Sequence, residues 1–256
     1  MVFAIKRIIN KIYMEKILKQ EQVYDNSECQ LKYLFFQNRK SNKLLVVFSG
    51  FPAKDKLPVY NYVLKFNSLN SKKLYILDNF GSDNRGSYYL GEKGNFFIDR
   101  AVTQLIEKIC IDNKIKKEDV ITAGTSKGGF AALYFSLKND YGASIVGEPQ
   151  ILLGNYLSAS NHKPIYEYII GEVNCENTKK LNSLLFNLIT NETKTRLYIH
   201  CGKDGYHHVN HIKPFVDYLK IAYNLDLGDY SEHGEVGKYF PSFAINIIKK
   251  ELVNNS

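Results

Sequence analysis

Cysteine is scarce in this chain, and its four cysteines lie far apart. Cys29, Cys110, Cys175 and Cys201 form no C-x-x-C pair, and none lies near a histidine at the spacing of a zinc site. Two of them, Cys110 and Cys201, lie in apolar runs, where a thiol acts as a small hydrophobic side chain. Reduced cysteines are typical of the cytoplasm, so we expect a cytoplasmic protein without disulfides and without a bound metal.

Long hydrophobic runs are missing as well. No run approaches the roughly 20 apolar residues that a membrane-spanning helix needs. Near the N-terminus, basic residues interrupt the apolar ones too early for a signal peptide, and no small-residue cleavage site follows. Residues 1–22 instead predict a basic amphipathic helix. Such a helix packs on its own domain or lies on an anionic membrane surface, which would place the protein on the inner face of the membrane.

Two nucleotide-binding signatures are absent. Neither G-x-x-x-x-G-K-[ST] nor G-x-G-x-x-G occurs, and Lys127 precedes a double glycine rather than following it. The net charge is +8, but the lysines are scattered and form no block, so we expect no nucleic-acid partner. Two interpretations of the charge stay open: attraction of another anionic partner, or a composition that is simply rich in lysine, asparagine and isoleucine.

The 256 residues predict a single α/β domain, residues 1–256, because apolar β-branched runs alternate with helical patterns. Near-continuous apolar runs are typical of parallel strands that are covered on both faces. We therefore predict a mostly parallel central sheet with helices on both faces. The predicted strands are 31–36, 44–48, 74–77, 120–123, 144–147, 196–200 and 225–229. The predicted helices are 58–69, 95–112, 127–138, 210–222 and 235–252.

One interval breaks this alternation. Residues 151–195 lie between two predicted strands, look mostly helical and are too long for a plain connection. Parallel α/β folds place ligands at the carboxyl ends of their strands. We therefore expect residues 151–195 to form a helical cap inserted over that edge, with a peripheral helical excursion as the alternative.

The sharpest motif is Gly124-Thr125-Ser126-Lys127-Gly128, which has the form G-x-S-x-G. It directly follows an apolar strand and directly precedes a helical run, which is the context of the nucleophile elbow in the α/β-hydrolase fold. The two glycines leave no Cβ to clash in the tight turn, and the turn pushes the Ser126 hydroxyl out above the sheet. The motif predicts that Ser126 is a nucleophile.

A serine nucleophile needs a base, and the base needs an orienting carboxylate. In this fold the chain order is serine, acid, histidine. Asp204 follows a strand and a glycine turn, and His233 follows the last strand, so we predict Asp204 as the acid and His233 as the base. The other candidates for the acid are Asp226, Asp229 and Glu232.

The oxyanion that forms on the substrate carbonyl needs preorganised N–H donors. One donor is expected to be the backbone N–H of Lys127, the residue after the nucleophile. The second is expected in the loop after the strand 44–48, from the N–H of Gly50 or Phe51. Pro52 has no N–H and cannot donate.

These motifs together resemble the bacterial capsular-polysaccharide O-acetyltransferases of α/β-hydrolase fold, over roughly residues 44–250. The motifs that carry the resemblance are 48–55 (FSGFPAKD), 60–62 (YNY), 85–89 (RGSYY), 124–129 (GTSKGG), Pro149-Gln150, 201–204 (CGKD), His208 and the loop of His233. The chain departs from the pattern in its longer N-terminal segment, in Glu148 before Pro149-Gln150, and in residues 151–195. These departures leave the acceptor sugar open.

The resemblance implies acetyl-CoA as acyl donor, a polysaccharide hydroxyl as acceptor and an acetylated Ser126 between the two steps. It also implies partners in a capsule-assembly complex at the inner membrane surface. Arg85, Tyr88, Gln150 and His208 are expected to contact substrate, and the Arg85 guanidinium could hold a phosphate of CoA or of an anionic polymer. Two alternatives stay open: a serine esterase that uses water as acceptor, and a non-enzymatic scaffold of the same fold.

Overall fold

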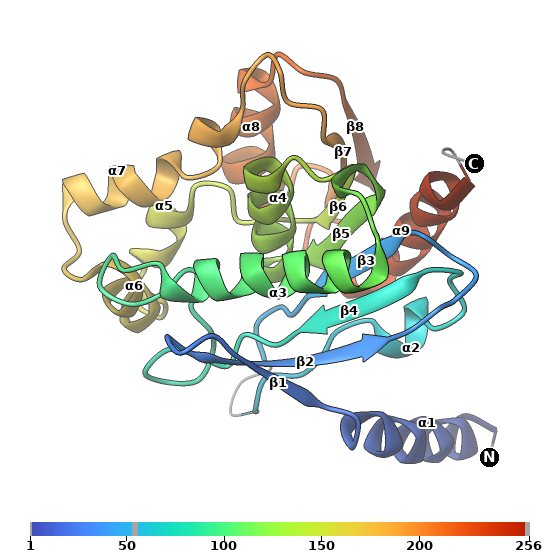
Figure 1. Ribbon diagram of the computed structural model, residues 1–256. Helices are drawn as coiled ribbons and strands as arrows, with labels where there is room; N and C mark the ends of the chain where they lie inside the picture. The colour runs from blue at the N-terminus through green and yellow to red at the C-terminus, as the bar shows by residue number, and fades with distance from the viewer. Residues whose placement is uncertain (1, 53–55, 254–256) are drawn as a thin grey trace.

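The computed structural model describes residues 2–52 and 56–253. Ala53, Lys54 and Asp55 of the 48–55 motif lie outside the described residues, as do Met1 and residues 254–256. Within the described part of the chain, eight strands form one sheet in the order β1-β2-β4-β3-β5-β6-β7-β8 (Figure 1). Their bounds are β1 (Gln22–Asp25), β2 (Gln30–Phe36), β3 (Leu44–Phe48), β4 (Lys72–Ile76), β5 (Val120–Thr125), β6 (Ala143–Gly147), β7 (Arg196–Gly202) and β8 (Tyr223–Gly228).

The sheet is parallel from β4 to β8 and antiparallel at its β1–β2 edge. β1 pairs with β2, and β2 with β4, in antiparallel register, whereas every neighbouring pair from β4 through β8 is parallel. β5 lies near the middle of the sheet, between β3 and β6. The expected mostly parallel sheet is therefore present, with the elbow at the end of an inner strand.

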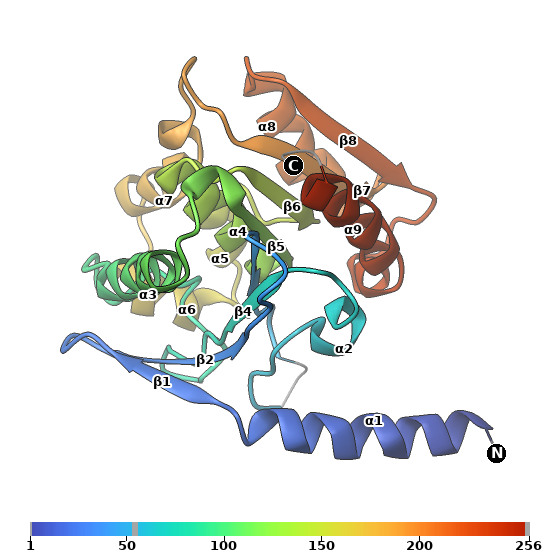
Figure 2. The same cartoon turned by 45° about the vertical axis from the view of Figure 1, so that its right-hand side comes forward.

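Helices cover both faces of this sheet, as Figures 1 and 2 show. The helices are α1 (Val2–Leu18), α2 (Val63–Phe66), α3 (Phe97–Asn113), α4 (Lys127–Asn139), α5 (Leu153–Leu157), α6 (Lys163–Ile170), α7 (Cys175–Ser183), α8 (Lys213–Tyr218) and α9 (Val236–Val253). Among the described residues, none of these helices combines the length and the apolar character that crossing a membrane requires.

Alternation along the strands produces two core layers. In β3, Leu44, Val46 and Phe48 pack with α3 and α4 on one face. Leu45 and Val47 pack with α2 and α9 on the other. Successive side chains of a strand point to opposite faces, and all five are buried, so β3 requires cover on both sides. This double cover explains why the central strands read as continuous apolar runs.

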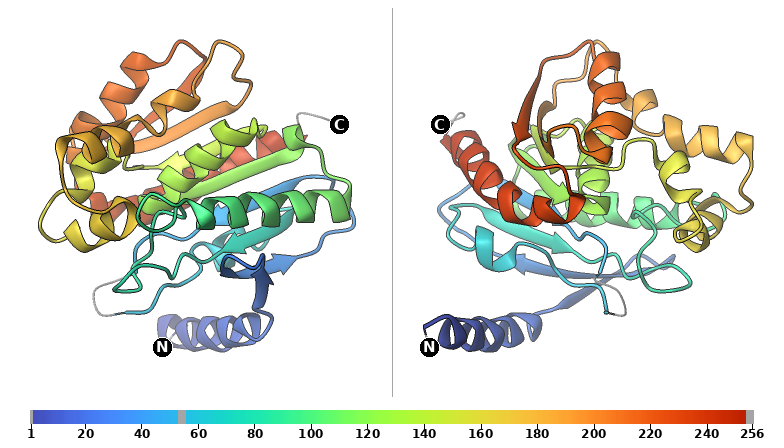
Figure 3. Two further views of the ribbon diagram at one scale, coloured as in Figure 1. Left: turned by 60° about the vertical axis from the view of Figure 1, so that its left-hand side comes forward. Right: turned by 180° about the vertical axis from the view of Figure 1, so that it is seen from behind.

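Residues 151–195 carry α5, α6, α7 and a short 3-10 turn at Phe186–Leu188. Leu153, Ile165 and Leu181 anchor the three helices in the core layer that also contains α3 and α4. Figures 1 and 3 place the group beyond the end of the sheet toward which β4 points, which is the carboxyl edge of the parallel strands. The segment therefore lies next to the elbow, although its role as a cap stays a prediction.

Three parts of the observed structure differ from the prediction. β1 was not predicted, because its four residues QVYD are polar or exposed and give no apolar signal. The helix predicted over 58–69 is reduced to α2. Tyr62, which directly precedes α2, has a φ of 62° in the left-handed region, so the helix cannot extend further toward residue 58. The helix predicted over 210–222 opens with a π-helical turn at His208–Ile212 and ends with α8 at Tyr218.

Candidate active site

The elbow between β5 and α4 holds Ser126 in a strained conformation, with φ 57° and ψ −122°. Its N–H donates to the carbonyl oxygen of Gly147 on the adjacent strand at 2.9 Å. The two motif glycines are sterically required: a Cβ at Gly124 would lie 2.2 Å from the Gly128 oxygen, and one at Gly128 would lie 2.5 Å from the Phe48 oxygen. Such a turn is typical of a nucleophile elbow, and the Ser126 side chain stays partly exposed.

His233 lies in the loop between β8 and α9 and reaches the serine. Its Nε2 is 3.0 Å from Ser126 Oγ, within hydrogen-bonding distance, across 107 residues of sequence. The structure thus brings together Ser126 and His233, which the sequence predicted as nucleophile and base. A base must lie within this reach of the proton that it removes.

The acid beside His233 is Glu148, and the prediction of Asp204 is not supported by the geometry. Glu148 Oε2 is hydrogen-bonded to His233 Nδ1, while Oε1 accepts from the N–H of Gly202 at 3.0 Å. The Glu148 side chain is 3% exposed. Asp204 is 78% exposed, and its carboxylate lies 4.0 Å from His208 Nδ1, because the turn after β7 points its side chain to solvent. The imidazole is therefore oriented from β6, not from β7.

Glu148 was not predicted, because Asp204, which follows the next strand, β7, also fitted the chain order serine, acid, histidine. The signal was nevertheless present, since Glu148 is a carboxylate directly after the apolar run of β6, and β6 neighbours the strand that leads to Ser126. Asp226, one of the fallback acids, is bonded to His200 Nδ1 at 2.6 Å. Within the described residues, neither Asp229 nor Glu232 forms a hydrogen bond or an ion pair with the His233 side chain.

Gln150 is a second hydrogen-bonding partner of the serine. Its Nε2 donates to Ser126 Oγ at 2.6 Å and lies 3.3 Å from His207 Nε2. Its carbonyl oxygen accepts from the Tyr88 hydroxyl at 3.3 Å. Gln150 and Tyr88 are fully buried, so Tyr88 acts on the site by orienting this amide. A contact of Tyr88 or Gln150 with substrate stays a prediction.

The ring of His207 stacks on the ring of His233, with centroids 3.9 Å apart and an angle of 13° between planes. Burial, with smaller contributions from the charges of His233 and His211, lowers the pKa of His207 to about 2. Burial and His233 likewise lower the pKa of His211 to about 4. Both rings are therefore neutral near pH 7, and they form a neutral wall beside the imidazole that faces Ser126.

Two backbone N–H groups are free to hold an oxyanion. Within the described residues, neither Lys127 N–H nor Phe51 N–H has an acceptor. Lys127 opens α4, where the helix dipole also favours negative charge. The N–H of Gly50 instead donates to Asn61 Oδ1 at 2.7 Å, so Gly50 is not available for the predicted role. Phe51 remains the candidate from the β3 loop.

The side chain of Lys127 is completely buried. Its Nζ donates to Asp78 Oδ2 at 2.9 Å and to the carbonyl oxygen of Arg85 at 3.1 Å. Burial lowers the pKa of Lys127, while the Asp78 carboxylate acts in the opposite direction. Asp78 also accepts from the N–H groups of Ser87 and Tyr89, so this ion pair ties the loop after β4 to the elbow.

Arg85 and His208 lie in the surroundings of the site. The Arg85 guanidinium donates to Asp83 Oδ2 at 2.6 Å and to the carbonyl oxygen of Asn161 at 3.0 Å, so it links the β4 loop to the segment before α6. His208 Nδ1 accepts from the N–H of Asp204 at 3.1 Å. A contact of either residue with substrate stays a prediction.

A metal could be held by Glu148, His207 and His233, whose ligand atoms all lie within 4.8 Å of one another. However, Glu148 is already bonded to His233 Nδ1, and His207 Nε2 lies against the Gln150 amide. A metal there would replace the bond that orients the base. The residues fit a hydrogen-bonded catalytic group better than a metal site, and the expected absence of a metal stays a prediction.

No protein-family model matches the chain, and no curated protein matches it. Among solved structures, the chain is similar to the capsule O-acetyltransferase of Neisseria meningitidis serogroup A in complex with caged gadolinium. The TM-score is 0.74 and the identity 25%, over 91% of this chain and 99% of that one. A histidine-to-alanine mutant of that enzyme in complex with CoA matches with a TM-score of 0.72 and 25% identity, over 89% of this chain and 94% of that one.

A fluorophosphonate-binding serine hydrolase of Staphylococcus aureus also matches, with a TM-score of 0.66 and 15% identity over 91% of this chain and 97% of that one. At this identity the likeness shows the fold alone. Together these neighbours support an enzyme that transfers or hydrolyses acyl groups. The chain has the α/β-hydrolase fold predicted from its sequence, and it resembles the meningococcal serogroup A capsule O-acetyltransferase.

Proposed function

We propose that the chain is a serine O-acetyltransferase that moves an acetyl group from acetyl-CoA to a hydroxyl of a capsular or other surface polysaccharide. The observation that carries the proposal is the contact between Ser126, His233 and Glu148 in an elbow of this fold. The choice of donor and acceptor is supported by the resemblance to a capsule O-acetyltransferase, of which a mutant was solved with CoA.

In the first step, Ser126 Oγ attacks the thioester carbonyl while its proton passes to His233 Nε2. Glu148 accepts the Nδ1–H of His233 and stabilises the imidazolium that forms. The N–H groups of Lys127 and Phe51 hold the oxyanion. When the carbon–sulfur bond breaks, the CoA thiolate takes the proton from His233, and Ser126 carries the acetyl ester.

In the second step, an acceptor hydroxyl gives its proton to His233 and attacks the acetyl carbonyl. Ser126 Oγ then leaves as the ester bond breaks, and it recovers the proton from His233. The Nε2–H of Gln150, which donates to Ser126 Oγ at 2.6 Å, would stabilise the negative charge on this oxygen as it leaves. Gln150 would therefore act on the nucleophile rather than on the acceptor.

Transfer and hydrolysis share this chemistry up to the acyl-enzyme, and they differ in whether a sugar hydroxyl or water attacks it. The second candidate is therefore a serine esterase, because Ser126 is partly exposed and water can reach it. The similarity to a serine hydrolase at 15% identity supports the fold common to both.

The test combines labelling and transfer. A fluorophosphonate should label the wild type and the control Ser231→Ala, which removes an exposed hydroxyl of the His233 loop, but not Ser126→Ala. Acetyl-CoA should then acetylate a member of a panel of de-O-acetylated capsular polysaccharides, as detected by proton NMR of the polymer. Release of acetate at one rate with and without polymer would identify a hydrolase. Absence of labelling on folded protein would favour a scaffold.

A further inference from the structure

The helix α1 leaves most of its surface uncovered. From Arg7 to Tyr13 every side chain is exposed, and the apolar residues Ile8, Ile9 and Ile12 are 59%, 59% and 51% exposed. Figures 2 and 3 show α1 standing at the margin of the molecule, beside the β1–β2 edge of the sheet. Exposed apolar residues recurring at helical spacing are unusual for a protein surface and mark an interaction site.

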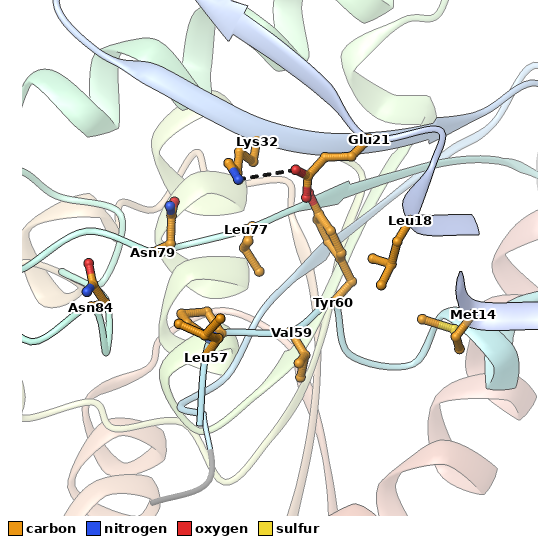
Figure 4. Close-up of a pocket in the computed structure, with 11 residues that line it drawn as sticks. Met14, Leu18, Glu21, Lys32, Leu57, Val59, Tyr60, Leu77, Asn79 and Asn84 are labelled. Atoms are coloured by element: carbon orange, nitrogen blue, oxygen red, sulfur yellow. Dashed lines mark hydrogen bonds and ion pairs between the residues drawn. The ribbon is translucent and has the colours of Figure 1, made fainter. Parts of the chain in front are cut away.

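The C-terminal turns of α1 are fixed to the body. Ile17 is buried against the core layer of α2 and α9, and Met14 packs against the same layer. Just after the helix, Glu21 accepts from the Tyr60 hydroxyl at 2.8 Å and pairs with Lys32 at 3.3 Å (Figure 4). Met14, Leu18 and Tyr60 line a cavity of about 500 Å³ at this junction. This attachment holds the helix in a defined direction, so it presents a constant face outward.

The charge on α1 is strongly one-sided. Five basic residues occur in residues 1–20 against one acidic residue, Glu15; they are Lys6, Arg7, Lys11, Lys16 and Lys19. Within the described part of the chain, the side chains of Arg7, Lys11, Lys16 and Lys19 form no ion pair. Exposed isoleucines flanked by unpaired basic residues fit the interface of an anionic lipid bilayer, where apolar acyl chains lie beneath negatively charged headgroups.

We propose that α1 docks the protein on an anionic lipid bilayer, with Ile8, Ile9 and Ile12 in the boundary between headgroups and acyl chains. Lysine and arginine side chains on its flanks would contact the anionic headgroups. A second copy of this chain is a poorer occupant, since pairing two α1 helices would bring like charges together. A bilayer needs no shape-matched groove, and α1 offers a convex, ridge-like face.

The proposal is tested on the full chain with two kinds of vesicle in a flotation assay. One contains about 30 mol% phosphatidylglycerol in phosphatidylcholine, and the other contains phosphatidylcholine alone. The wild type should float with the anionic vesicles, at least about tenfold more tightly than with the neutral ones, and about 0.5 M NaCl should release it. Equal or absent binding to the two kinds of vesicle would overturn the proposal.

Variants locate the contact. Ile8→Gln with Ile12→Gln, and Lys11→Gln with Lys16→Gln, should each weaken anionic binding about tenfold, through lost apolar burial and lost charge respectively. The matched controls are Ile111→Gln, at an isoleucine of α3 that is 77% exposed, and Lys179→Gln with Lys220→Gln, at two other exposed lysines. The controls should bind like the wild type, and all variants should keep its thermal unfolding.

Two results would contradict the assignment to lipid. If the α1 variants float as well as the wild type, binding lies elsewhere on the basic surface. The second result combines two measurements. If the wild type does not float with either kind of vesicle and sediments as a dimer, and the Ile8→Gln, Ile12→Gln variant sediments as a monomer, the occupant of the α1 face is a second copy. Neither measurement involves Ser126, so the docking proposal and the proposed acetyl transfer can fail separately.

Discussion

At the scale of single residues, the position of the carboxylate beside His233 decides how the base is oriented. Glu148 begins the loop after β6 with a φ of 43°, an unusual conformation for a residue other than glycine. This backbone turns the side chain toward His233, and the N–H of Gly202 fixes its other oxygen. A buried carboxylate with both oxygens engaged is well suited to hold one tautomer of an imidazole.

We predict that Glu148→Gln lowers kcat by about 10³–10⁴-fold, because a glutamine amide no longer stabilises the imidazolium. Asp204→Asn, at an exposed position away from His233, should lower it less than about threefold. The measurement is the rate of acyl transfer or of fluorophosphonate labelling, with circular dichroism to verify folding. The reverse order of the two effects would restore Asp204 as the orienting acid.

The sequence could predict Ser126 and His233 because each has a local signal. Ser126 lies in a glycine-bounded turn between a strand and a helix, and His233 follows the last strand of a fold with a known chain order. Glu148 has only a weaker signal, a carboxylate directly after an apolar strand. Neither its bond to His233 nor the bond of Gln150 to Ser126 follows from that pattern, because both depend on which strand ends meet at the elbow. The hydrogen bond from the Gly50 N–H to Asn61 Oδ1 could not be predicted either, because it joins residues 11 positions apart and no motif indicates it.

At the scale of elements, the β5–α4 elbow is held together by close backbone approaches. α4 passes so near to β5 and to the end of β3 that only glycine fits at positions 124 and 128. We predict that Gly124→Ala destabilises the fold by about 3 kcal/mol or more, since the Gly128 backbone must move to admit the Cβ.

Gly237→Ala, in the first turn of α9, is the matched control for Gly124→Ala. A Cβ there meets nothing within 4 Å, and alanine is the better helix former. Its stability should therefore stay within about 1 kcal/mol of the wild type. Urea unfolding measures both variants. An equal effect at the two positions would show that the elbow tolerates expansion.

The loop after β4 is joined to the same elbow by the buried pair Lys127–Asp78. Removing one partner of a buried pair leaves the other charge without compensation. Lys127→Met should therefore cost about 3–5 kcal/mol, and Lys127→Met with Asp78→Asn should cost less than the sum of the two single changes. A double-mutant cycle by urea unfolding measures this coupling. Additive effects would mean that the pair does not tie the loop to the helix.

At the scale of the whole molecule, elements distant in sequence supply the site. The nucleophile comes from the β5–α4 turn, the acid and Gln150 from the end of β6, the stacked His207 from beyond β7, and the base from beyond β8. Parallel strands end at one edge, so their loops converge there whatever their order in the chain. Folding of the sheet and assembly of the site are thus one event, which links the site chemistry to global stability.

This link predicts a dependence of stability on pH. Burial lowers the pKa of His207 to about 2 and that of His211 to about 4, from an ordinary value of 6.5. Below pH 6.5 the unfolded chain binds protons at both rings and the folded chain does not. The free energy of unfolding therefore falls as the pH falls, by up to about 2 kcal/mol for each ring between pH 7 and pH 5.

Urea unfolding at pH 7 and pH 5 measures this loss directly, and the variant His207→Gln with His211→Gln separates it from the effect of other groups. Neither glutamine titrates, so the variant should lose less stability than the wild type over the same interval, even if it is less stable at pH 7. A wild-type stability that does not change between pH 7 and pH 5 would mean that His207 and His211 accept protons in the folded state, and the neutral wall beside His233 would not exist.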